Sequence, residues 1–434
     1  MSRRFATYFM VASLVTTTII SAVTLGCSGG EERLNVLLIC VDTLRPDRLG
    51  YCGHRRNTSP TIDKLAGEGV VFEKCYSVAG WTLPAMATIF TGHYPRDHGA
   101  TDFHWSIDPK LPTLTGVLRR EGYDTRAYVS HVILKPEYGL ADGFRSYDYS
   151  VLNVGHPHDV ATAEQLTDLV INDLREIEKP FFIWAHYFDP HFAYLTHGRW
   201  ASFGNTDIDR YDQEIAHTDY HIARLLRELE KKGLDDNTIV IFTSDHGEEF
   251  GEHDGQYHYT LYEEILLSPL VIKAPFLEPR ASRTVVEQID FAPTILGMLG
   301  LEFDGELPGR DVLTDSTGVR PIFFERDRPP PWVQRGVIFE GHKLFVIEIA
   351  DTTKIPITSR GTYSKVKNVH PGIYMYDLSK DPAETHNLYS ETDPKAKELL
   401  GLLARHFAAP RPSVHSVEVD EELKKKLRSL GYIR

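Results

Sequence analysis

The sequence predicts an α/β fold, in which helices cover both faces of a mostly parallel β-sheet and a smaller C-terminal α+β subdomain follows. The first observation is that short, continuous apolar runs recur before residue 320, as in strands buried on both faces. The second is that longer helical patterns separate these runs, which is typical of parallel βαβ units. The chain has 434 residues, 42% of them hydrophobic, which is enough for a core of this size.

The elements of the first part follow in chain order. Apolar runs predict strands at residues 35–41, 128–130, 181–186 and 238–243. Periodic patterns predict helices at residues 60–66, 84–91, 114–120, 159–177 and 211–232. Ser59 before Pro60 indicates a capped helix start, and Pro84 indicates another. Thr82 therefore lies at or just before a helix N-terminus, where free N–H groups and the helix dipole favour an anion.

Polar residues stand at the ends of three of these strands. Asp42 follows the first strand, His186 ends the third, and Asp245 follows the fourth. Because the carboxyl ends of parallel strands meet at one edge of a sheet, we expect these side chains to cluster there. Open α/β sheets place their functional sites at this edge.

The pattern changes after about residue 321. Alternating apolar segments predict antiparallel strands at 337–339, 343–347 and 373–378, and a helix follows at 395–406. Three consecutive prolines at 329–331 mark a loop. We therefore predict a main domain over residues 34–320 and a C-terminal α+β subdomain over residues 321–434.

The first 26 residues have the pattern of an export signal, with Arg3-Arg4 before an uncharged, mostly apolar run. Thr24-Leu25-Gly26-Cys27 resembles a bacterial lipobox, although Thr24 replaces the usual large aliphatic residue. We expect cleavage before Cys27, lipidation of that residue, and a linker over residues 27–33. The lipoprotein would then attach to a membrane of the bacterial cell envelope, on the periplasmic or outer surface. A retained membrane anchor and ordinary secretion are the alternatives.

Charge and cysteine content limit the partners and the cross-links. The formal net charge is −14, which argues against nucleic acid as a partner. Apart from Cys27, the chain has Cys40, Cys52 and Cys75, so at most one pair can form. Cys40 lies inside an apolar run and is expected in the core. A Cys52–Cys75 bridge is left open, because the sequence does not test its geometry.

A series of short motifs between residues 35 and 388 resembles the sulfatase family of the alkaline phosphatase superfamily. Any one motif alone is weak, but all occur in order. The resemblance implies an alkaline-phosphatase-like fold and hydrolysis of sulfuric or phosphoric esters. Residues 423–433 also resemble the tail of envelope-attached members. The motifs are Val41-Asp42-Thr43-Leu44-Arg45-Pro46-Asp47, Thr91-Gly92-His93-Tyr94-Pro95 with His98-Gly99, His186-Tyr187-Phe188-Asp189-Pro190-His191, Thr243-Ser244-Asp245-His246-Gly247-Glu248, Leu261-Tyr262-Glu263-Glu264, Asp290-Phe291-Ala292-Pro293-Thr294-Ile295-Leu296, and Tyr376-Asp377-Leu378 with Asp381-Pro382.

The departures from the family concern the nucleophile. The family motif is Cys or Ser, any residue, Pro, any residue, Arg, and here it reads Thr82-Leu83-Pro84-Ala85-Met86. Thr cannot become the formylglycine aldehyde, because its β-carbon carries a methyl group, so we expect no formylglycine. Met86 replaces the anion-binding Arg. Asp42-Thr43 replaces an acidic pair, so one metal carboxylate is missing, and His258 stands near a position where relatives often carry Lys.

The resemblance implies one divalent metal ion, held by Asp42, Asp245, His246 and Thr82. Coordination of the Thr82 hydroxyl would lower its pKa and make it nucleophilic. Because an imidazole replaces a carboxylate, Mn²⁺ or Zn²⁺ suits the site better than the Ca²⁺ of typical sulfatases.

Histidines supply the remaining candidates. His191 and His258 are expected to bind the anion or to protonate the leaving group, since imidazole can donate a proton near neutral pH. Asp189, His191 and His258 could instead hold a second metal ion or the substrate, as the two-zinc relatives do with one Asp and two His. The weaker candidates are His186, His253 and Asp254, and the expected structural histidines are His93 and His98.

Three functions compete at this stage. The first is a metal-dependent hydrolase of sulfate esters or phosphodiesters, acting on a small-molecule or glycan ester through Thr82. The family favours sulfate esters, whereas the Thr favours phosphodiesters. The second is a transferase that moves a phospho-alcohol group onto an envelope glycan or lipid. The third is a non-catalytic envelope binding protein, favoured by the missing Arg and Asp.

Overall fold

The computed structural model describes residues 33–153, 160–315, 318–327, 332–349 and 370–408, with positions 414–417, 419, 421, 424, 425 and 427. Residues 34–434 belong to one unit of contacting elements. The expected signal segment, the lipidation site Cys27, the proline loop 329–331 and most of the C-terminal tail lie outside the described residues. No helix in the described ranges has the length and apolar character needed to cross a membrane.

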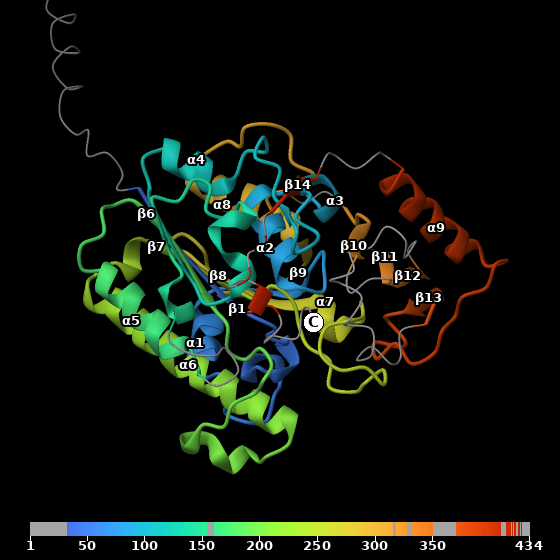
Figure 1. The fold of residues 1–434 in the computed structure, drawn as a ribbon, viewed down its shortest axis with the longest axis horizontal. Coiled ribbons are helices and arrows are strands. Elements are labelled where there is room, and N and C mark those ends of the chain that lie inside the picture. The colour runs from blue at the N-terminus through green and yellow to red at the C-terminus, as the bar shows by residue number, and fades with distance from the viewer. Residues whose placement is uncertain are drawn as a thin grey trace, which may run out of the picture. The chain divides into compact units, whose positions relative to one another are not determined.

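An eight-stranded, mostly parallel sheet forms the centre of the molecule (Figure 1). Only β8 runs antiparallel, against both β7 and β2, while the other neighbours pair in parallel. The strands in spatial order are β5 (Ser146–Asp148), β4 (Asp124–Val129), β6 (Phe181–Tyr187), β1 (Asn35–Val41), β7 (Thr238–Thr243), β8 (Leu267–Lys273), β2 (Val70–Tyr76) and β9 (Arg280–Glu287).

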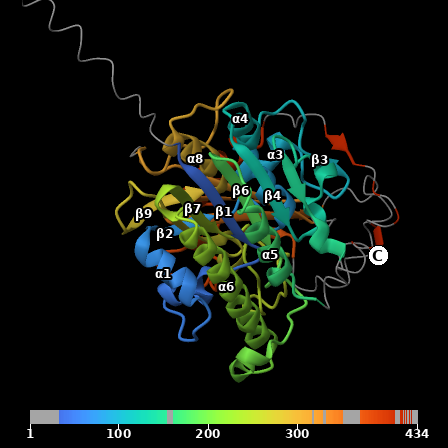
Figure 2. The ribbon, with the colours of Figure 1, turned by 90° about the vertical axis from the view of Figure 1, so that its left-hand side faces the viewer.

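Helices cover both faces of this sheet (Figure 2). Alternate residues of β1 explain why: Leu38 packs into one apolar core, whereas Leu37 packs into the other. Both cores consist of buried apolar side chains, so each face of the sheet must be covered by its own layer of helices. The first core contains α2 (Thr82–Thr91), α4 (Leu114–Arg120) and α8 (Phe291–Leu299); the second contains α1 (Pro60–Glu68), α5 (Ala163–Asp173) and α6 (Asp207–Lys231). The predicted α/β class is confirmed.

A second, four-stranded antiparallel sheet follows. The helix α9 (Pro394–His406) packs Leu399 and Leu403 against Leu344 of this sheet. The strand β10 (Ile322–Arg326) was not predicted from the sequence, because a run of five residues is too short for a clear pattern. The strands are β10 (Ile322–Arg326), β11 (Trp332–Phe339), β12 (His342–Ile349) and β13 (Gly372–Asp377), while β3 (Trp105–Ser106) and β14 (His415–Ser416) form a separate pair.

Four strands of the main sheet, β2, β5, β8 and β9, were not predicted from the sequence, and the elements that were predicted differ from the observed ones mainly at their ends. The helix expected at 159–177 is shorter, because the Asp189 carboxylate accepts hydrogen bonds from Thr162 and Ala163 and so fixes its start. The helix expected at 211–232 begins earlier, at a capping box made by Thr206 and Asp209. Such caps are side-chain contacts, which apolar periodicity does not report.

Cys40, Cys52 and Cys75 are free thiols. Cys75 is buried in β2, while Cys52 is exposed in a short 3-10 turn. The Cys52–Cys75 bridge that the sequence left open does not form. Cys40 is buried in β1, as expected.

A buried ion pair joins the two sheets. The Nζ atom of Lys343, a fully buried residue of β12, lies 2.8 Å from Glu384 Oε1 and 3.3 Å from Glu263 Oε1. Glu263 begins the short helix α7 (Glu263–Leu266), and its backbone N–H also donates to Glu384 at 2.6 Å. This lysine therefore neutralises carboxylates contributed by both parts of the chain.

We expect Lys343→Met to lower the free energy of unfolding by about 3–5 kcal/mol, because it leaves two carboxylates buried without their cation. Lys380→Met is the matched control. Lys380 pairs with Asp377, but its side chain is 82% exposed, so its removal should cost at most about 1 kcal/mol. Urea denaturation measures both variants, and equal losses would contradict this role of Lys343.

Candidate active site

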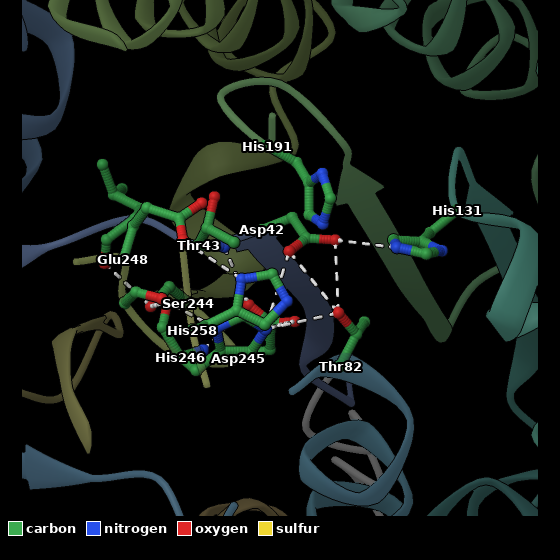
Figure 3. A network of polar contacts seen from close by, with 12 residues as sticks. Asp42, Thr43, Thr82, His131, His191, Ser244, Asp245, His246, Glu248 and His258 are labelled. Carbon is green, nitrogen blue, oxygen red and sulfur yellow. Dashed lines mark hydrogen bonds and ion pairs between the residues drawn. The ribbon is translucent and has the colours of Figure 1, made fainter. Parts of the chain in front are cut away.

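Side chains from four strand ends and one helix start converge at one edge of the main sheet (Figure 3). Asp42 follows β1, His131 lies two residues beyond β4, and His186 lies near the end of β6. Asp245 and His246 follow β7, and Thr82 is the first residue of α2. The parallel strands all end on this side, which is why residues far apart in the sequence meet here.

The Thr82 hydroxyl lies at the centre of this group. Its oxygen is 3.5 Å from both carboxylate oxygens of Asp42 and 3.4 Å from Nε2 of His246. Thr82 is 1% exposed, and its backbone begins α2, where the unpaired N–H groups carry partial positive charge. A hydroxyl in this position can act as a nucleophile, and the helix start can stabilise an anion.

Hydrogen bonds orient the carboxylate of Asp245. Its Oδ1 accepts from the backbone N–H groups of Thr43, at 3.1 Å, and His246, at 2.8 Å. Thr43 has a left-handed φ of 54°, which is rare for a β-branched residue. The Tyr211 hydroxyl holds that conformation by donating to the Thr43 carbonyl at 2.6 Å and accepting from Arg45 N–H at 2.9 Å. Asp245 Oδ2 has no hydrogen-bond partner among the described residues.

His246 presents one ring nitrogen to the carboxylates. Its Nδ1 lies 2.8 Å from the Gly247 carbonyl, which can only accept, so Nδ1 carries the proton. Nε2 then bears the lone pair and lies 3.4 Å from Asp245 Oδ2 and 3.9 Å from Asp42 Oδ1. A backbone carbonyl that fixes the tautomer in this way is the usual support of a metal-binding histidine.

His186 is closer to the carboxylates than its weak standing in the sequence suggested. Ligand atoms of His186, Asp42 and Asp245 all lie within 4.8 Å of one another. The ring is fully buried, and neither nitrogen has a hydrogen-bond partner among the described residues. Burial lowers the pKa of His186 to about 4, so the ring is neutral and could serve as a ligand.

This group of residues fits a divalent cation. Burial raises the pKa of Asp42 well above its usual range, and the nearby carboxylates of Asp245 and Glu248 raise it further. Asp245 Oδ2 and Thr43 Oγ are buried and have no hydrogen-bond partner in the part of the chain that the structure describes. A cation would neutralise the carboxylates and provide the missing partners.

Met86 does not take the place of an anion-binding arginine. It is fully buried in α2, and its sulfur lies 3.6 Å from the Cys40 thiol of β1. The side chain thus belongs to the core beneath the site. The positive charge that an arginine would supply must come from elsewhere.

Three imidazoles flank the carboxylates. His258 lies 4.7 Å from His246 and 5.4 Å from His191 between ring centroids, and His191 lies 5.5 Å from His131. The Nδ1 of His191 is held by the Phe192 carbonyl at 2.8 Å, and that of His258 by Glu248 Oε1 at 3.1 Å. The structure thus brings both predicted histidines to the site and leaves their Nδ1 atoms anchored.

Sequence reasoning missed two residues of the site. His131 Nε2 lies 3.8 Å from Asp42 Oδ2, and its Nδ1 accepts from the Ile133 N–H at 3.2 Å. Glu248 is fully buried, and burial raises its pKa to about 7 although His191 and His246 act to lower it. Position alone could have found both, since His131 follows a strand end and Glu248 lies in the Asp245 motif.

The other candidates lie outside the cluster. The Asp189 carboxylate is used by the start of α5, where it accepts from Thr162 N, Thr162 Oγ and Ala163 N at 2.8–3.0 Å. The expected set of Asp189, His191 and His258 therefore does not come together as ligands. His253 stacks on Tyr262 and pairs with Glu264 at 3.4 Å. The remaining candidates are in turns or bonded to α2: Asp254, His93 and His98.

Comparisons with known proteins agree with this geometry. A family model described as Sulfatase matches residues 34–301, well over half of the chain. An N-acetylglucosamine-6-O-sulfatase of Bacteroides thetaiotaomicron is 22% identical over 86% of this chain and 86% of its own length. Iduronate 2-sulfatase of Homo sapiens is 21% identical over 83% of this chain and 92% of its own length.

Solved structures share the fold. A protein solved in complex with its substrate, D-glucosamine-2-N,6-O-disulfate, has a TM-score of 0.69 at 20% identity, covering 86% of this chain and 97% of its own. The phosphonate monoester hydrolase of Agrobacterium radiobacter has a TM-score of 0.71 at 21% identity, covering 86% of this chain and 96% of its own. These likenesses confirm the alkaline-phosphatase-like fold that the sequence predicts.

Asp189 and Asp42 should behave in opposite ways when each is changed to Ala. Asp189→Ala should lower the free energy of unfolding by about 1–2 kcal/mol, because the start of α5 loses its acceptor, and should leave metal content unchanged. Asp42→Ala should remove metal binding without that loss, because it relieves repulsion with Asp245. Urea denaturation in chelator and elemental analysis measure the two effects. Metal loss in Asp189→Ala would contradict the capping role.

Proposed function

We propose that this chain, which belongs to the sulfatase family and is a sulfate ester hydrolase, uses Thr82 as its nucleophile. We further propose that its substrate is a sulfated glycan. The observation that carries the proposal is the position of the Thr82 hydroxyl, at the start of α2 and within 3.5 Å of Asp42 and His246. The names of relatives support a glycan, since one acts on N-acetylglucosamine 6-O-sulfate and another was solved with a disulfated glucosamine.

A divalent cation is part of this proposal. Asp42, Asp245 and His246 would hold it beside Thr82, with His186 as a further ligand that the structure suggests. When bound, such a cation lowers the pKa of a coordinated hydroxyl and offsets the negative charge of the ester. The mixed oxygen and nitrogen ligands favour Mn²⁺ or Zn²⁺ over Ca²⁺.

The first chemical step is attack of Thr82 on sulfur. The Oγ–S bond forms as the bond from sulfur to the leaving oxygen breaks, which leaves a threonine sulfate ester. Both oxygens of Asp42 lie 3.5 Å from Thr82 Oγ, so Asp42 orients the hydroxyl and is placed to accept its proton. His258, whose Nδ1 lies 3.1 Å from Glu248 Oε1, can protonate the leaving oxygen once its ring has taken up a proton. His131 can donate to a sulfate oxygen through Nε2, because its Nδ1 accepts the Ile133 N–H, whereas the Nδ1 proton of His191 is directed at the Phe192 carbonyl.

The second step must differ from that of an enzyme with formylglycine. A formylglycine hydrate expels sulfate by elimination, which a threonine ester cannot do. Water must therefore attack the threonine ester and release the second product while Thr82 is regenerated. Attack at phosphorus is easier than attack at sulfur, so Thr82 also favours phosphodiesters or phosphonate monoesters as a second candidate class. The similarity to a phosphonate monoester hydrolase supports the same candidate.

The cellular location remains a prediction from the N-terminal sequence. The apolar run before Cys27 favours export and lipid attachment in the bacterial cell envelope. An envelope enzyme would meet extracellular sulfated glycans directly. A transferase reaction onto envelope glycans is less well supported, because the curated relatives reported above are hydrolases of sulfate esters.

An assay with matched leaving groups tests the reaction class. The purified protein should hydrolyse nitrophenyl sulfate and 6-O-sulfated glucosamine faster than nitrophenyl phosphate, bis-nitrophenyl phosphate and nitrophenyl phenylphosphonate. Chelation should abolish turnover, and Mn²⁺ or Zn²⁺ should restore it better than Ca²⁺, because the site combines carboxylates with imidazole. Faster hydrolysis of the diester or the phosphonate would establish the second candidate class. No turnover of any ester with any of these cations would refute the enzymatic function.

Substitutions at Thr82 test the nucleophile. Thr82→Ala should lower kcat by about 10⁴-fold, and Thr82→Ser should keep measurable activity because it keeps a hydroxyl. Thr91→Ala is the matched control, since Thr91 lies in the same helix but its hydroxyl bonds the backbone away from the site, donating to the Ala87 carbonyl and accepting from the His93 N–H. Mass spectrometry of quenched reactions should find the sulfate ester on the peptide that contains Thr82. An active Thr82→Ala protein would overturn the mechanism.

A further inference from the structure

The side-chain amide of Gln288 joins the turn before Thr82 to the backbone of Asp245, which lies just beyond the end of β7. Gln288 is fully buried in the 3-10 turn Gln288–Asp290, directly after β9. Its Oε1 accepts from the Val78 N–H at 3.2 Å and from the Ser77 hydroxyl at 3.0 Å. Its Nε2 donates to the Asp245 carbonyl at 2.6 Å.

We propose that Gln288 is a positioning residue of the active site, which sets the distance between the Thr82 nucleophile and the Asp245 carboxylate. The inference rests on the proposed function, in that it concerns the same nucleophile and the same reaction. Gln288 does not touch the Thr82 hydroxyl or the Asp245 carboxylate in the structure. It acts instead through the backbone on both sides of the site.

The orientation of this amide is determined by its partners. The Val78 N–H can only donate, so it must face the amide oxygen. The Asp245 carbonyl can only accept, so it must face the amide nitrogen. A side chain with one donor end and one acceptor end is therefore required, and glutamine provides both at every pH, whereas an ionised glutamate of the same length provides acceptors alone.

The turn that Gln288 holds leads directly to the nucleophile. Residues 77–81 connect β2 to the start of α2 at Thr82. On its other side the turn is bound by β10, where Glu325 N–H donates to the Val78 carbonyl at 2.9 Å and the Arg326 guanidinium donates to the Gly80 carbonyl. The second sheet and Gln288 thus bind the turn from two sides. Gln288 also donates to the Asp245 carbonyl, so it connects the turn to the other side of the site.

Small displacements matter at such a site. Thr82 must attack in line with the leaving oxygen while Asp42 and Asp245 keep their places, and an error of about 1 Å can cost about 10²-fold in rate. Residues that orient catalytic groups from behind typically contribute about 10- to 100-fold. We therefore expect the loss of Gln288 to lower kcat more than it raises KM.

Two substitutions separate the two ends of the amide. Gln288→Glu keeps an acceptor for Val78 and Ser77 but, when its carboxyl is ionised, loses the donor to Asp245, and Gln288→Met loses both. We expect kcat to fall by about 10-fold in Gln288→Glu and by about 100-fold in Gln288→Met. KM and the inhibition constant of the product sulfate should change by less than about 3-fold, because neither variant removes a group that touches the anion.

Gln213 provides the matched control. It is also a fully buried glutamine whose amide joins two backbone segments: Oε1 accepts from the His197 N–H at 3.0 Å and Nε2 donates to the Gly204 carbonyl at 2.7 Å. Gln213→Met should lower the melting temperature about as much as Gln288→Met while leaving kcat within about 3-fold of wild type. Equal effects of the two substitutions on kcat would overturn the proposal, as would a Gln288→Met protein of normal kcat.

Crystal structures of the Gln288→Met and wild-type proteins keep this test independent of turnover. The proposal requires Thr82 Oγ to move relative to the Asp245 carboxylate in the variant, and not in Gln213→Met. If the wild-type protein hydrolyses no ester, the proposed function fails, yet a displaced Thr82 would still support the positioning role. If the wild type is active and Thr82 does not move in Gln288→Met, the positioning role fails by itself. If Gln288→Met does not fold, Gln288→Glu, whose side chain has the same length as that of glutamine, takes its place in this comparison.

Discussion

The site depends on two carboxylates that the sheet buries side by side. Asp42 and Asp245 follow the adjacent strands β1 and β7, whose register pairs Cys40 with Thr243 just before them. Both are fully buried, so each raises the cost of charging the other. The pKa of Asp245 is nevertheless lowered, against the effect of burial, because His246 and His186 lie beside it. The fit for a divalent cation follows from this concentration of negative charge.

The departures from the sulfatase pattern form one consistent arrangement. Where relatives carry an arginine, Met86 packs beneath β1, and the groups near the ester are neutral imidazoles and the start of α2. Burial lowers the pKa of His191 to about 3, with the neighbouring His258 acting in the same direction. Fixed positive charge comes from the Arg326 guanidinium of β10, which lies close enough to His258 to lower the pKa of that ring further.

The C-terminal sheet contributes to the site without supplying one of the clustered side chains. Its strand β10 binds the turn before Thr82, while Lys343 neutralises Glu384 and Glu263, the second of which lies a few residues after His258. The turn before Thr82 and the segment after His258 are thus both bound to the second sheet. This arrangement gives a physical reason for that sheet to belong to one unit with the catalytic residues.

The sequence by itself determined the α/β class, the start of a helix at Thr82 and the strand ends that carry Asp42, His186 and Asp245, because buried strands and helix starts leave local patterns. Only the tertiary structure decided that Asp189 caps α5, that His131 and Glu248 join the site, and that Gln288 joins two loops. Those roles depend on contacts between residues that lie tens of positions apart, and spacing along the chain carries no record of them.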